Sequence, residues 1–362
     1  RGLGDVYKRQ KYVFVLIFFC ACKNVKTDCQ IDDLFTNRIF LEYEKIPSNG
    51  YIWGTPMDMI YCDSAIIVFD EKSEDGLFHL VDLNDLDSIY DFGKKGQGVN
   101  EFLMPFDIQL FGKSSISVYD LYKKTLNVMN ISDVKNRISN FSVLTKDTIP
   151  GTIKVFPTAF NTFVSLGFYE DCMFRLWGTG LIEEEHFMEY PYKDGDEKQI
   201  ANRLRGMAYQ GIIRLNPFMD KFVYAVNTSE IIHFYKINNT DISLIKKYEM
   251  NYPIYKTQVE GDMRAAPISS SNNSTFISLC ISPKYVYGLY SGKNFKENGL
   301  ETLAGTIIYV FDWNGEAIKK YELNVPVTLI SVDNKDEMLY AFSNMPCLLY
   351  TSPSPRDSTS SR

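Results

Sequence analysis

Short apolar and aromatic runs between polar turns are the dominant pattern along the chain, and a helical period is nearly absent. Runs of this kind that close on a turn residue are typical of β-strands. Six of them follow one another, and their ends are spaced about 50 to 65 residues apart. They are Ala65–Asp70, Ser115–Asp120, Thr162–Phe168, Phe222–Asn227, Tyr285–Ser291 and Met338–Asn344.

Each of the first five runs is followed by a second and a third, as Leu77–Leu83 and Ser88–Phe92 follow Ala65–Asp70. A unit of three or four strands cannot bury both faces of its sheet alone, and stacking such units in a closed ring solves this. Strands buried on both faces also read as continuous apolar runs. The pattern therefore predicts an all-β protein, a six-bladed β-propeller. Two tandem β-sandwiches are the alternative, but the repeat crosses the middle of the chain without a linker.

The two ends of the repeat determine how the ring closes. Ile39–Ile46 is the candidate strand for pairing with the last blade. The sixth unit has one clear strand, at Met338–Phe342, before a tail rich in serine and proline. We therefore expect a truncated last blade with an exposed edge, and such edges favour aggregation.

Residues 1–10 (RGLGDVYKRQ) and 347–362 (CLLYTSPSPRDSTSSR) both resemble translated sequencing-adapter read-through. We interpret the two segments as artefact sequence and exclude them from the fold. The alternative is a genuine basic start and a genuine tail. On the first interpretation the propeller spans residues 38–346.

An apolar run of ten residues, Tyr12–Ala21, ends at Cys22. A bilayer-spanning helix needs about 20 residues, whereas the shorter length fits the apolar core of a secretory signal peptide. The letters FCAC at the end of the run resemble a bacterial lipobox, which implies a signal peptide over residues 11–21 and a lipid on Cys22. Residues 22–37 then form a lipid-anchored tether at the cell envelope, on the outer membrane or the periplasmic face. A short buried strand is the alternative.

The formal net charge is −7, and no cluster of lysine and arginine interrupts the acidic body of the chain. Nucleic-acid binding needs such clusters at the phosphates, so the sequence argues against this class of partner. Binding to anionic lipid by surface charge is disfavoured for the same reason. The expected partners are the membrane, through the lipid anchor, and a protein, peptide or glycan ligand. We expect a monomer.

The seven cysteines do not have the spacing of a disulfide framework. Cys62, Cys172 and Cys280 lie in or beside apolar runs, and we interpret them as small buried hydrophobic residues. A single chance bridge in an oxidising compartment is left open.

Two stretches resemble a known family. Asp91–Pro105 reads DFGKKGQGVNEFLMP, and Tyr285–Lys293 reads YVYGLYSGK before IIYVFDWNGEAIKKYEL at Ile307–Leu323. Together they resemble the TolB-like, or NHL-like, six-bladed propeller lipoproteins of Bacteroides-type bacteria, the BF-series lipoproteins, over nearly the whole body of the chain. Val99 departs from the proline more common in that family, which implies a slightly looser turn. The resemblance implies a fold and no reaction.

The glycine-rich loop Gly93–Gly98 exposes backbone N–H groups beside Lys94 and Lys95, as a phosphate site does. It lacks the GK[ST] signature of a P-loop, and no helical pattern follows it. The favoured interpretation is a crossing between two blades, where glycines allow positive φ and close sheet contact.

His79, His186 and His233 fall in different units, and a metal needs convergent ligands, so we expect no metal site and no cofactor. No nucleophile elbow is present. Propeller topology places a ligand site at the mouth of the central channel, built from loops and the starts of the innermost strands. The candidate ligand-binding residues at blade entrances are Lys95, Gln97, Tyr255 and Arg264.

These observations favour a non-catalytic binding or scaffold propeller at the cell envelope. The alternative is a propeller-fold hydrolase or lyase that acts on a peptide or polysaccharide. The channel mouth distinguishes the two functions. Convergent acids with a histidine in hydrogen-bond reach would favour the enzyme, and a mixed aromatic and polar funnel would favour binding.

Overall fold

The computed structural model describes residues 30–46, 51–74, 76–86, 88–178, 184–261 and 263–344, and the backbone of 347–353. The predicted artefact at residues 1–10, the predicted signal peptide and Cys22 lie outside the described residues. Among the described residues, no helix is both long enough and apolar enough to cross a membrane.

Six sheets of four or five strands follow one another along the chain, which confirms the predicted all-β propeller. The first blade is β3 (Pro56–Cys62), β4 (Ala65–Asp70), β5 (Phe78–Asp82) and β6 (Ile89–Phe92). The second is β9 (Pro105–Phe111), β10 (Ser115–Asp120), β11 (Thr125–Asn130) and β12 (Ser142–Lys146). The third is β13 (Thr152–Pro157), β14 (Thr162–Gly167), β15 (Phe174–Gly178) and β16 (Glu185–Phe187).

The fourth blade is β17 (Gly211–Leu215), β18 (Lys221–Val226), β19 (Ile231–Ile237) and β20 (Ile242–Glu249). The fifth is β23 (Asn273–Ile281), β24 (Tyr285–Asn294), β25 (Gly305–Asp312) and β26 (Ala317–Val327), with β1 (Arg38–Leu41) added outside β26. The sixth is β27 (Leu329–Val332), β28 (Met338–Asn344), β29 (Cys347–Pro353) and β2 (Glu44–Ile46).

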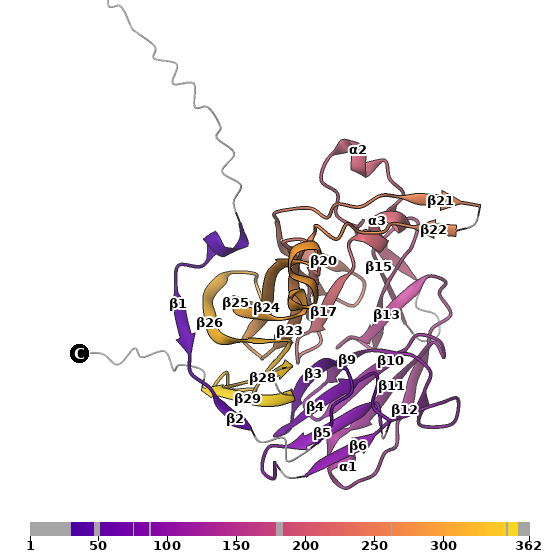
Figure 1. Ribbon diagram of the computed structural model, residues 1–362. Coiled ribbons are helices and arrows are strands. Elements are labelled where there is room, and N and C mark those ends of the chain that lie inside the picture. Colours follow the sequence, from indigo (N-terminus) through magenta and orange to yellow (C-terminus); the bar gives the residue numbers. More distant parts are fainter. Residues whose placement is uncertain are drawn as a thin grey trace, which may run out of the picture.

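Short elements occupy the connections between strands. They are η1 (Ile31–Leu34), the strand pair β7 (Lys94–Lys95) and β8 (Glu101–Phe102), α1 (Ile131–Lys135), α2 (Gly195–Lys198), α3 (Asn202–Ala208), the hairpin β21 (Gln258–Glu260) and β22 (Met263–Ala265), α4 (Phe295–Asn298) and η2 (Gly299–Leu303). Figure 1 shows α2, α3 and the β21–β22 hairpin together at one end of the molecule.

The ring closes because a cluster of buried side chains fills the space between each pair of neighbouring blades. The last cluster joins blade 6 to blade 1, where Met59 and Val68 pack with Leu329 and Phe342. Blade faces buried on both sides explain why β4 is buried at every position. Cys62, Cys172 and Cys280 are buried free thiols, as predicted.

Closure at the N-terminal end differs from the expected single strand. Residues Arg38–Leu41 run parallel to β26 of blade 5, and only Glu44–Ile46 pair with β29 of blade 6. The segment therefore crosses from one blade to the next along the left side of Figure 1. The pairing covers the outer edge of β26, which would otherwise present unpaired backbone groups to solvent.

The last blade also differs from the expectation of missing outer strands. Cys347–Pro353, within the segment interpreted as artefact tail, pairs along its whole length with β28, and β2 then covers β29. The sixth sheet thus has four strands and its edge is occupied by the N-terminal segment. The adapter-like origin of residues 347–362 stays a prediction.

Buried aspartates fix the entrances to the first two inner strands. The Asp70 carboxylate accepts hydrogen bonds from the backbone N–H groups of Gly54 and Thr55, at 2.6 and 2.5 Å. The Asp120 carboxylate accepts in the same way from Leu103 and Met104, at 2.7 and 3.3 Å. Both aspartates also accept from N–H groups of their own turns, which is the role expected of an aspartate at a strand end. The chain just before β3 and β9 is thereby held to the second strand of its own blade.

Candidate functional site

The starts of the inner strands surround a cavity of about 340 Å³ at the mouth of the central channel. Each blade contributes a side chain from its inner strand: Asp58 from β3, Asp107 from β9, Lys154 from β13, Arg214 from β17, Ser278 from β23 and Leu329 from β27. The position agrees with the channel-mouth site predicted from propeller topology.

The guanidinium of Arg214 links four blades at the floor of this cavity. Its Nη1 donates to Asp107 Oδ1 at 2.9 Å, its Nη2 donates to Asp58 Oδ1, and its Nε donates to the carbonyl of Leu279 on β23 at 2.9 Å. The side chain is only 4% exposed. A planar guanidinium with donors in a fixed fork is suited to bridging two carboxylates, so Arg214 holds the inner strands in register around the channel.

Lys154 and Gln109 complete the network beside Asp107. Lys154 Nζ lies 3.5 Å from Asp107 Oδ2 and donates to the carbonyl of Gly211 at 3.3 Å. Gln109 donates to Asp107 Oδ2 and to the carbonyl of Ile213, both at 2.9 Å. Two carboxylates therefore face two cations, and the floor of the cavity is close to neutral when all four groups are charged.

Burial shapes the electrostatics of the floor. It raises the pKa of the Asp58 carboxyl, an effect that the nearby guanidinium of Arg214 opposes and the Asp107 carboxylate reinforces. Burial alone would lower the pKa of Arg214, but the two carboxylates raise it, so the guanidinium stays charged. The floor thus combines a permanent cation with a carboxyl that protonates more readily than an exposed one.

The walls of the cavity are largely apolar, in contrast to its floor. Met57 and Phe106 contribute solvent-exposed apolar surface, and further apolar lining comes from Ile153, Ile212 and Ile277. The polar residues of the lining outside the floor include Glu71, Gln210 and Asn227. Polar floors with apolar walls are the usual composition of small-molecule sites, and a volume of about 340 Å³ lies at the lower end of their range.

The four sequence-predicted ligand residues lie on the crossings that lead into inner strands. Lys95 and Gln97 are exposed on the connection between β6 and β9, and Arg264 is exposed on β22. Tyr255, between β20 and β21, is half-buried with its ring centroid 6.3 Å from that of Tyr209. None of the four lines the cavity. Their role in ligand binding stays a prediction.

The glycine-rich loop is a crossing between blades, as favoured from the sequence. Gly93 has a φ of +70°, and β7 and β8 pair in parallel across the loop. The carboxylate of Glu101 accepts the N–H of Gly98 at 2.7 Å, while Lys123 donates to the carbonyls of Gly98 and Glu101. Of the backbone donors that suggested a phosphate site, the N–H of Gly98 thus already faces a carboxylate of the protein itself, and the N–H of Gly96 donates to the carbonyl of Phe102.

Sequence reasoning missed the residues that form the cavity floor, although a signal was present. Pro56-Met57-Asp58 and Pro105-Phe106-Asp107 repeat the same pattern, proline, a large apolar residue and aspartate, at the start of two inner strands. Lys154 holds the equivalent third position in β13. A charged residue that recurs at one strand position in successive repeats points to a shared location, which here is the channel.

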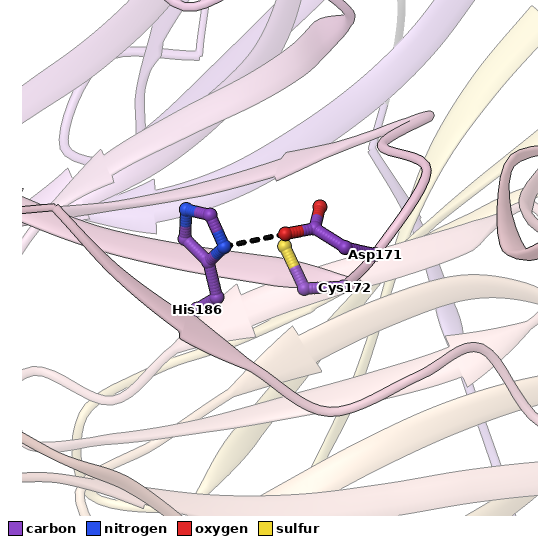
Figure 2. A group of neighbouring side chains, drawn as sticks. All are labelled: Asp171, Cys172 and His186. Carbon is purple, nitrogen blue, oxygen red and sulfur yellow. Dashed lines mark ion pairs between the residues drawn. The ribbon is translucent and has the colours of Figure 1, made fainter.

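The three histidines lie in three different blades, as expected, and none lines the cavity. Each nevertheless has an acidic neighbour: His79 Nδ1 lies 2.7 Å from Asp91 Oδ1, and His233 Nε2 lies 3.0 Å from Glu249 Oε1. At the edge of blade 3, Asp171, Cys172 and His186 come together, as Figure 2 shows. Residues 171 and 172 lie in the β14–β15 turn, so their approach to β16 depends on hairpin geometry and was not visible in the sequence.

Several solved structures are similar to the chain, and the three described below have 8 to 12% sequence identity to it. A Bacteroides fragilis protein named as exported has 12% identity and a TM-score of 0.48, over 91% of this chain and 98% of that one. Regucalcin from Agrobacterium tumefaciens, named a calcium-binding protein, has 8% identity and a TM-score of 0.48, over 88% and 97%. The β-propeller domain of Cps50 (Swd1) from Myceliophteria thermophila has 12% identity and a TM-score of 0.44, over 83% and 82%.

No curated protein matches the chain in sequence. One family model does, and it covers residues 45–335, the range that contains the first five blades and the beginning of the sixth. That family is described as TolB-like, 6-blade propeller-like. The match agrees with the six sheets, with the inner strands around the channel and with the resemblance noted in the sequence. The chain belongs to the TolB-like six-blade propeller-like family.

Proposed function

We propose that this protein is an exported, lipid-anchored propeller that binds a small polar group of a peptide or glycan at its channel mouth without catalysing a reaction. The observation that carries the proposal is the composition of the cavity. Its floor is a closed network of paired charges, its walls are apolar, and it is the size of a small-ligand site.

The paired floor favours binding over catalysis. A general acid or base needs to exchange protons with a substrate, and both carboxylates of the floor are engaged by Arg214, with Lys154 and Gln109 beside Asp107. The third carboxylate of the lining, Glu71, is exposed. All three histidines of the chain are within the described residues and lie outside the cavity. The lining of the cavity mixes aromatic and polar residues, which is the composition expected of a binding site at the channel mouth.

Phe106 tests the binding proposal, because its ring lies on the cavity wall and is partly exposed. Phe218, which lines a second cavity whose residues include Gly112, Pro217 and Pro283, is the matched control. Thermal unfolding of the purified chain is measured with a panel of di- and tripeptides and mono- and disaccharides at millimolar concentration. At least one probe should raise the melting temperature of the wild type and of Phe218→Ala, and the shift should be lost in Phe106→Ala.

The two probe classes separate a peptide ligand from a glycan ligand. A panel in which no peptide and no saccharide stabilises the wild type contradicts binding at the channel mouth. Equal loss of the shift in both phenylalanine variants would place the ligand elsewhere.

The N-terminal segment of the described chain supports the anchoring part of the proposal. Ile31 is fully buried and its N–H donates to Glu230 Oε2 at 3.1 Å, and Phe35 stacks on Tyr309 with ring centroids 4.7 Å apart. Seven residues separate Gln30 from Cys22, which at full extension reach at most roughly 30 Å. A lipid on Cys22 would thus hold Gln30, which lies next to these contacts with blades 4 and 5, within that distance of the bilayer.

The anchor is tested with Cys22→Ser and the matched Cys29→Ser in cells that process lipoproteins. Cys22→Ser should move the protein from the membrane fraction to the soluble fraction and abolish incorporation of labelled fatty acid. Cys29→Ser should change neither. If the Cys22→Ser protein stayed in the membrane fraction, the lipid anchor would be wrong, and the proposal of a binding site at the channel mouth would still stand.

One observation favours the alternative, a hydrolase or lyase. The buried Asp58 carboxyl, with its raised pKa, lies in a network with the Asp107 carboxylate, and a carboxyl whose pKa is raised by burial can act as a general acid. An enzyme would turn over a stabilising peptide or saccharide, and Asp58→Asn would abolish that turnover while keeping the thermal shift. The binding proposal predicts that each stabilising probe is recovered intact.

A further inference from the structure

The edge of blade 3 carries a cluster that the channel-mouth proposal does not use. Asp171 and Cys172 lie in the turn between β14 and β15, and His186 lies on β16, the outer strand of the blade. Figure 2 shows the Asp171 carboxylate turned toward the imidazole, with the Cys172 sulfur next to it. One ligand atom from each of the three residues lies within 4.8 Å of the others, and His186 Nδ1 is 2.5 Å from Asp171 Oδ2.

Strand pairing produces this convergence. Phe174 pairs with Phe187 and Arg175 pairs with His186 in the β15–β16 register. The N–H of Met173 donates to the carbonyl of Met188 at 2.6 Å, which extends the pairing to the residue after Cys172. The turn residues Asp171 and Cys172 are therefore carried to the same edge as His186.

The three side chains form a ligand set suited to zinc. A thiolate, an imidazole and a carboxylate are its three protein ligand types, and sites with three protein ligands leave a fourth position for water or another ligand. Hard-ion sites for calcium or magnesium use oxygen ligands instead, so the sulfur and nitrogen atoms here favour zinc over those ions.

The geometry allows zinc to enter with a small adjustment. Two ligands bound at about 2.0 to 2.3 Å to a tetrahedral ion lie roughly 3.3 to 3.8 Å apart, so Asp171 and His186 would separate by about 1 Å. Their side chains are 50% and 42% exposed and have room to move. Cys172 is 2% exposed, so the sulfur is the fixed point around which the other two ligands would close.

The residues around the cluster match the outer contacts of a zinc site. A histidine that binds a metal through one ring nitrogen normally donates its other N–H to a carboxylate or carbonyl. His186 Nε2 lies 3.0 Å from Glu184 Oε1, while Nδ1 faces Asp171 and Cys172. Arg175 in turn forms ion pairs with Glu184 and with Asp171, the latter at 3.3 Å. Its guanidinium also lies over the Tyr169 ring, 4.2 Å from the ring centroid.

Charge also favours a divalent cation at this edge. The carboxylates of Asp171 and Glu184 carry two negative charges, and the guanidinium of Arg175 offsets one of them. Zinc would convert the Cys172 thiol to a thiolate, with release of its proton to solvent, and the sum of the cluster and the ion would be zero. Arg175 therefore balances the charge of the second carboxylate.

We propose that Asp171, Cys172 and His186 form a zinc-binding site at the outer edge of blade 3, with a solvent-accessible fourth position. The ion would join the β14–β15 turn to β16, so its first effect is to stabilise this blade. The proposal is independent of the ligand at the channel mouth.

Cobalt serves as the spectroscopic probe, since Co²⁺ accepts zinc-type ligand sets and its bond to a thiolate gives a charge-transfer band in the near ultraviolet. The full chain is stripped with chelator and titrated with CoCl₂, and zinc affinity is then measured by competition with a chromophoric chelator. We expect one cobalt ion per chain with a thiolate band, displaced by one equivalent of ZnCl₂. Cys172→Ser should abolish the band, and His186→Gln should weaken zinc binding at least 100-fold.

Two controls separate the site from adventitious binding and from misfolding. His233→Gln removes a histidine that also has an acidic neighbour, Glu249, but belongs to no such ligand group among the described residues, and it should leave zinc affinity unchanged. His186→Gln acts at a half-exposed position and should keep the circular dichroism spectrum of the wild type. No stoichiometric cobalt band in the wild type, or a band that persists in Cys172→Ser, would overturn the proposal.

Discussion

The network around Arg214 and the cluster around His186 are built from similar parts in opposite settings. Each joins two carboxylates to an arginine: Asp58 and Asp107 at the channel, Asp171 and Glu184 at the edge of blade 3. The first is buried and links four blades through their inner strands. The second is partly exposed and lies within one blade.

The difference shows what burial does to a charge cluster. At the channel every charge has a partner on another blade, and removal of one partner would leave the others buried without compensation. At the edge, water can replace a lost partner, so each pair contributes little to stability and its members are free to bind something else. The buried network is therefore a structural floor for a site, and the exposed cluster is the more open to an ion.

The largest effect is expected from removal of Arg214. Arg214→Met leaves the carboxylates of Asp58 and Asp107 without their shared cation in a buried setting, and should lower the free energy of unfolding by about 3 to 5 kcal/mol. Urea denaturation followed by circular dichroism measures the loss. Arg264→Met, at an exposed hairpin residue that donates to the carbonyl of Gly261, is the matched control and should cost less than about 0.5 kcal/mol. A loss below about 1 kcal/mol for Arg214→Met would contradict its role as the link between blades.

A second buried pair gives an intermediate effect that depends on pH. Burial alone would raise the pKa of Glu249, but hydrogen bonds and charges from His233 and Lys247 lower it to about 2. The unfolded chain has the ordinary value near 4.5, so the stabilisation is fully present above pH 4.5 and is lost as the pH falls toward 2. We expect a loss of about 1 to 2 kcal/mol across this window, after allowance for the partial exposure of the group.

Glu249→Gln should remove that part of the pH dependence, as measured by urea unfolding at a series of pH values between 2 and 6. Burial also lowers the pKa of His233, so stability should begin to fall with pH already below the ordinary histidine value of 6.5, in the same direction. The exposed Glu301, paired with Lys293 at 3.2 Å, supplies the control Glu301→Gln. Parallel pH profiles for the wild type and Glu249→Gln would show that the pair contributes nothing.

The blades could be predicted from the sequence because their middle strands are buried on both faces. Ala65–Asp70, Ser115–Asp120 and Met338–Asn344 are strands β4, β10 and β28 with the predicted bounds. All six apolar runs that defined the repeat prove to be second strands of blades. A strand packed between neighbouring blades has no polar face, so its continuous apolar sequence is enough to identify it.

The inner strands could not be recognised in the same way, because one of their faces lines a channel. In β9 the charged Asp107 and the polar Gln109 alternate with apolar residues, and β17 carries Arg214 between Ile213 and Leu215. Because their sequences mix polar and apolar residues, such strands are easily taken for the polar connections between strands when only apolar runs are sought. The residues of the candidate site were therefore missed because polar side chains of inner strands, such as Asp107 and Arg214, face the channel and interrupt the apolar pattern.

The edge cluster was beyond sequence reasoning for a different reason. Thirteen residues separate Cys172 from His186, and only the β14–β15 turn and the β15–β16 register bring them together. The histidines were correctly assigned to separate blades, but metal ligands also include cysteine and aspartate, and a search for convergent histidines overlooks them. In a sequence, a Cys just before and a His just after one short predicted strand of a hairpin would indicate such a metal site.

The smallest change in stability is expected at that edge. Glu184→Gln removes a carboxylate that pairs with Arg175 and His186 at a partly exposed position, so the metal-free protein should lose no more than about 1 kcal/mol. The same substitution should weaken zinc binding by about 10- to 100-fold, because Glu184 orients the imidazole of His186 without touching the ion. Glu189→Gln, which breaks the pair of Glu189 with Arg205 at 2.8 Å outside the cluster, should leave zinc affinity at the wild-type value. If Glu184→Gln lowered the free energy of unfolding as much as Arg214→Met, the contrast between the two clusters would be wrong. A small loss of stability together with weaker zinc binding would establish that exposure leaves the edge cluster free to bind an ion.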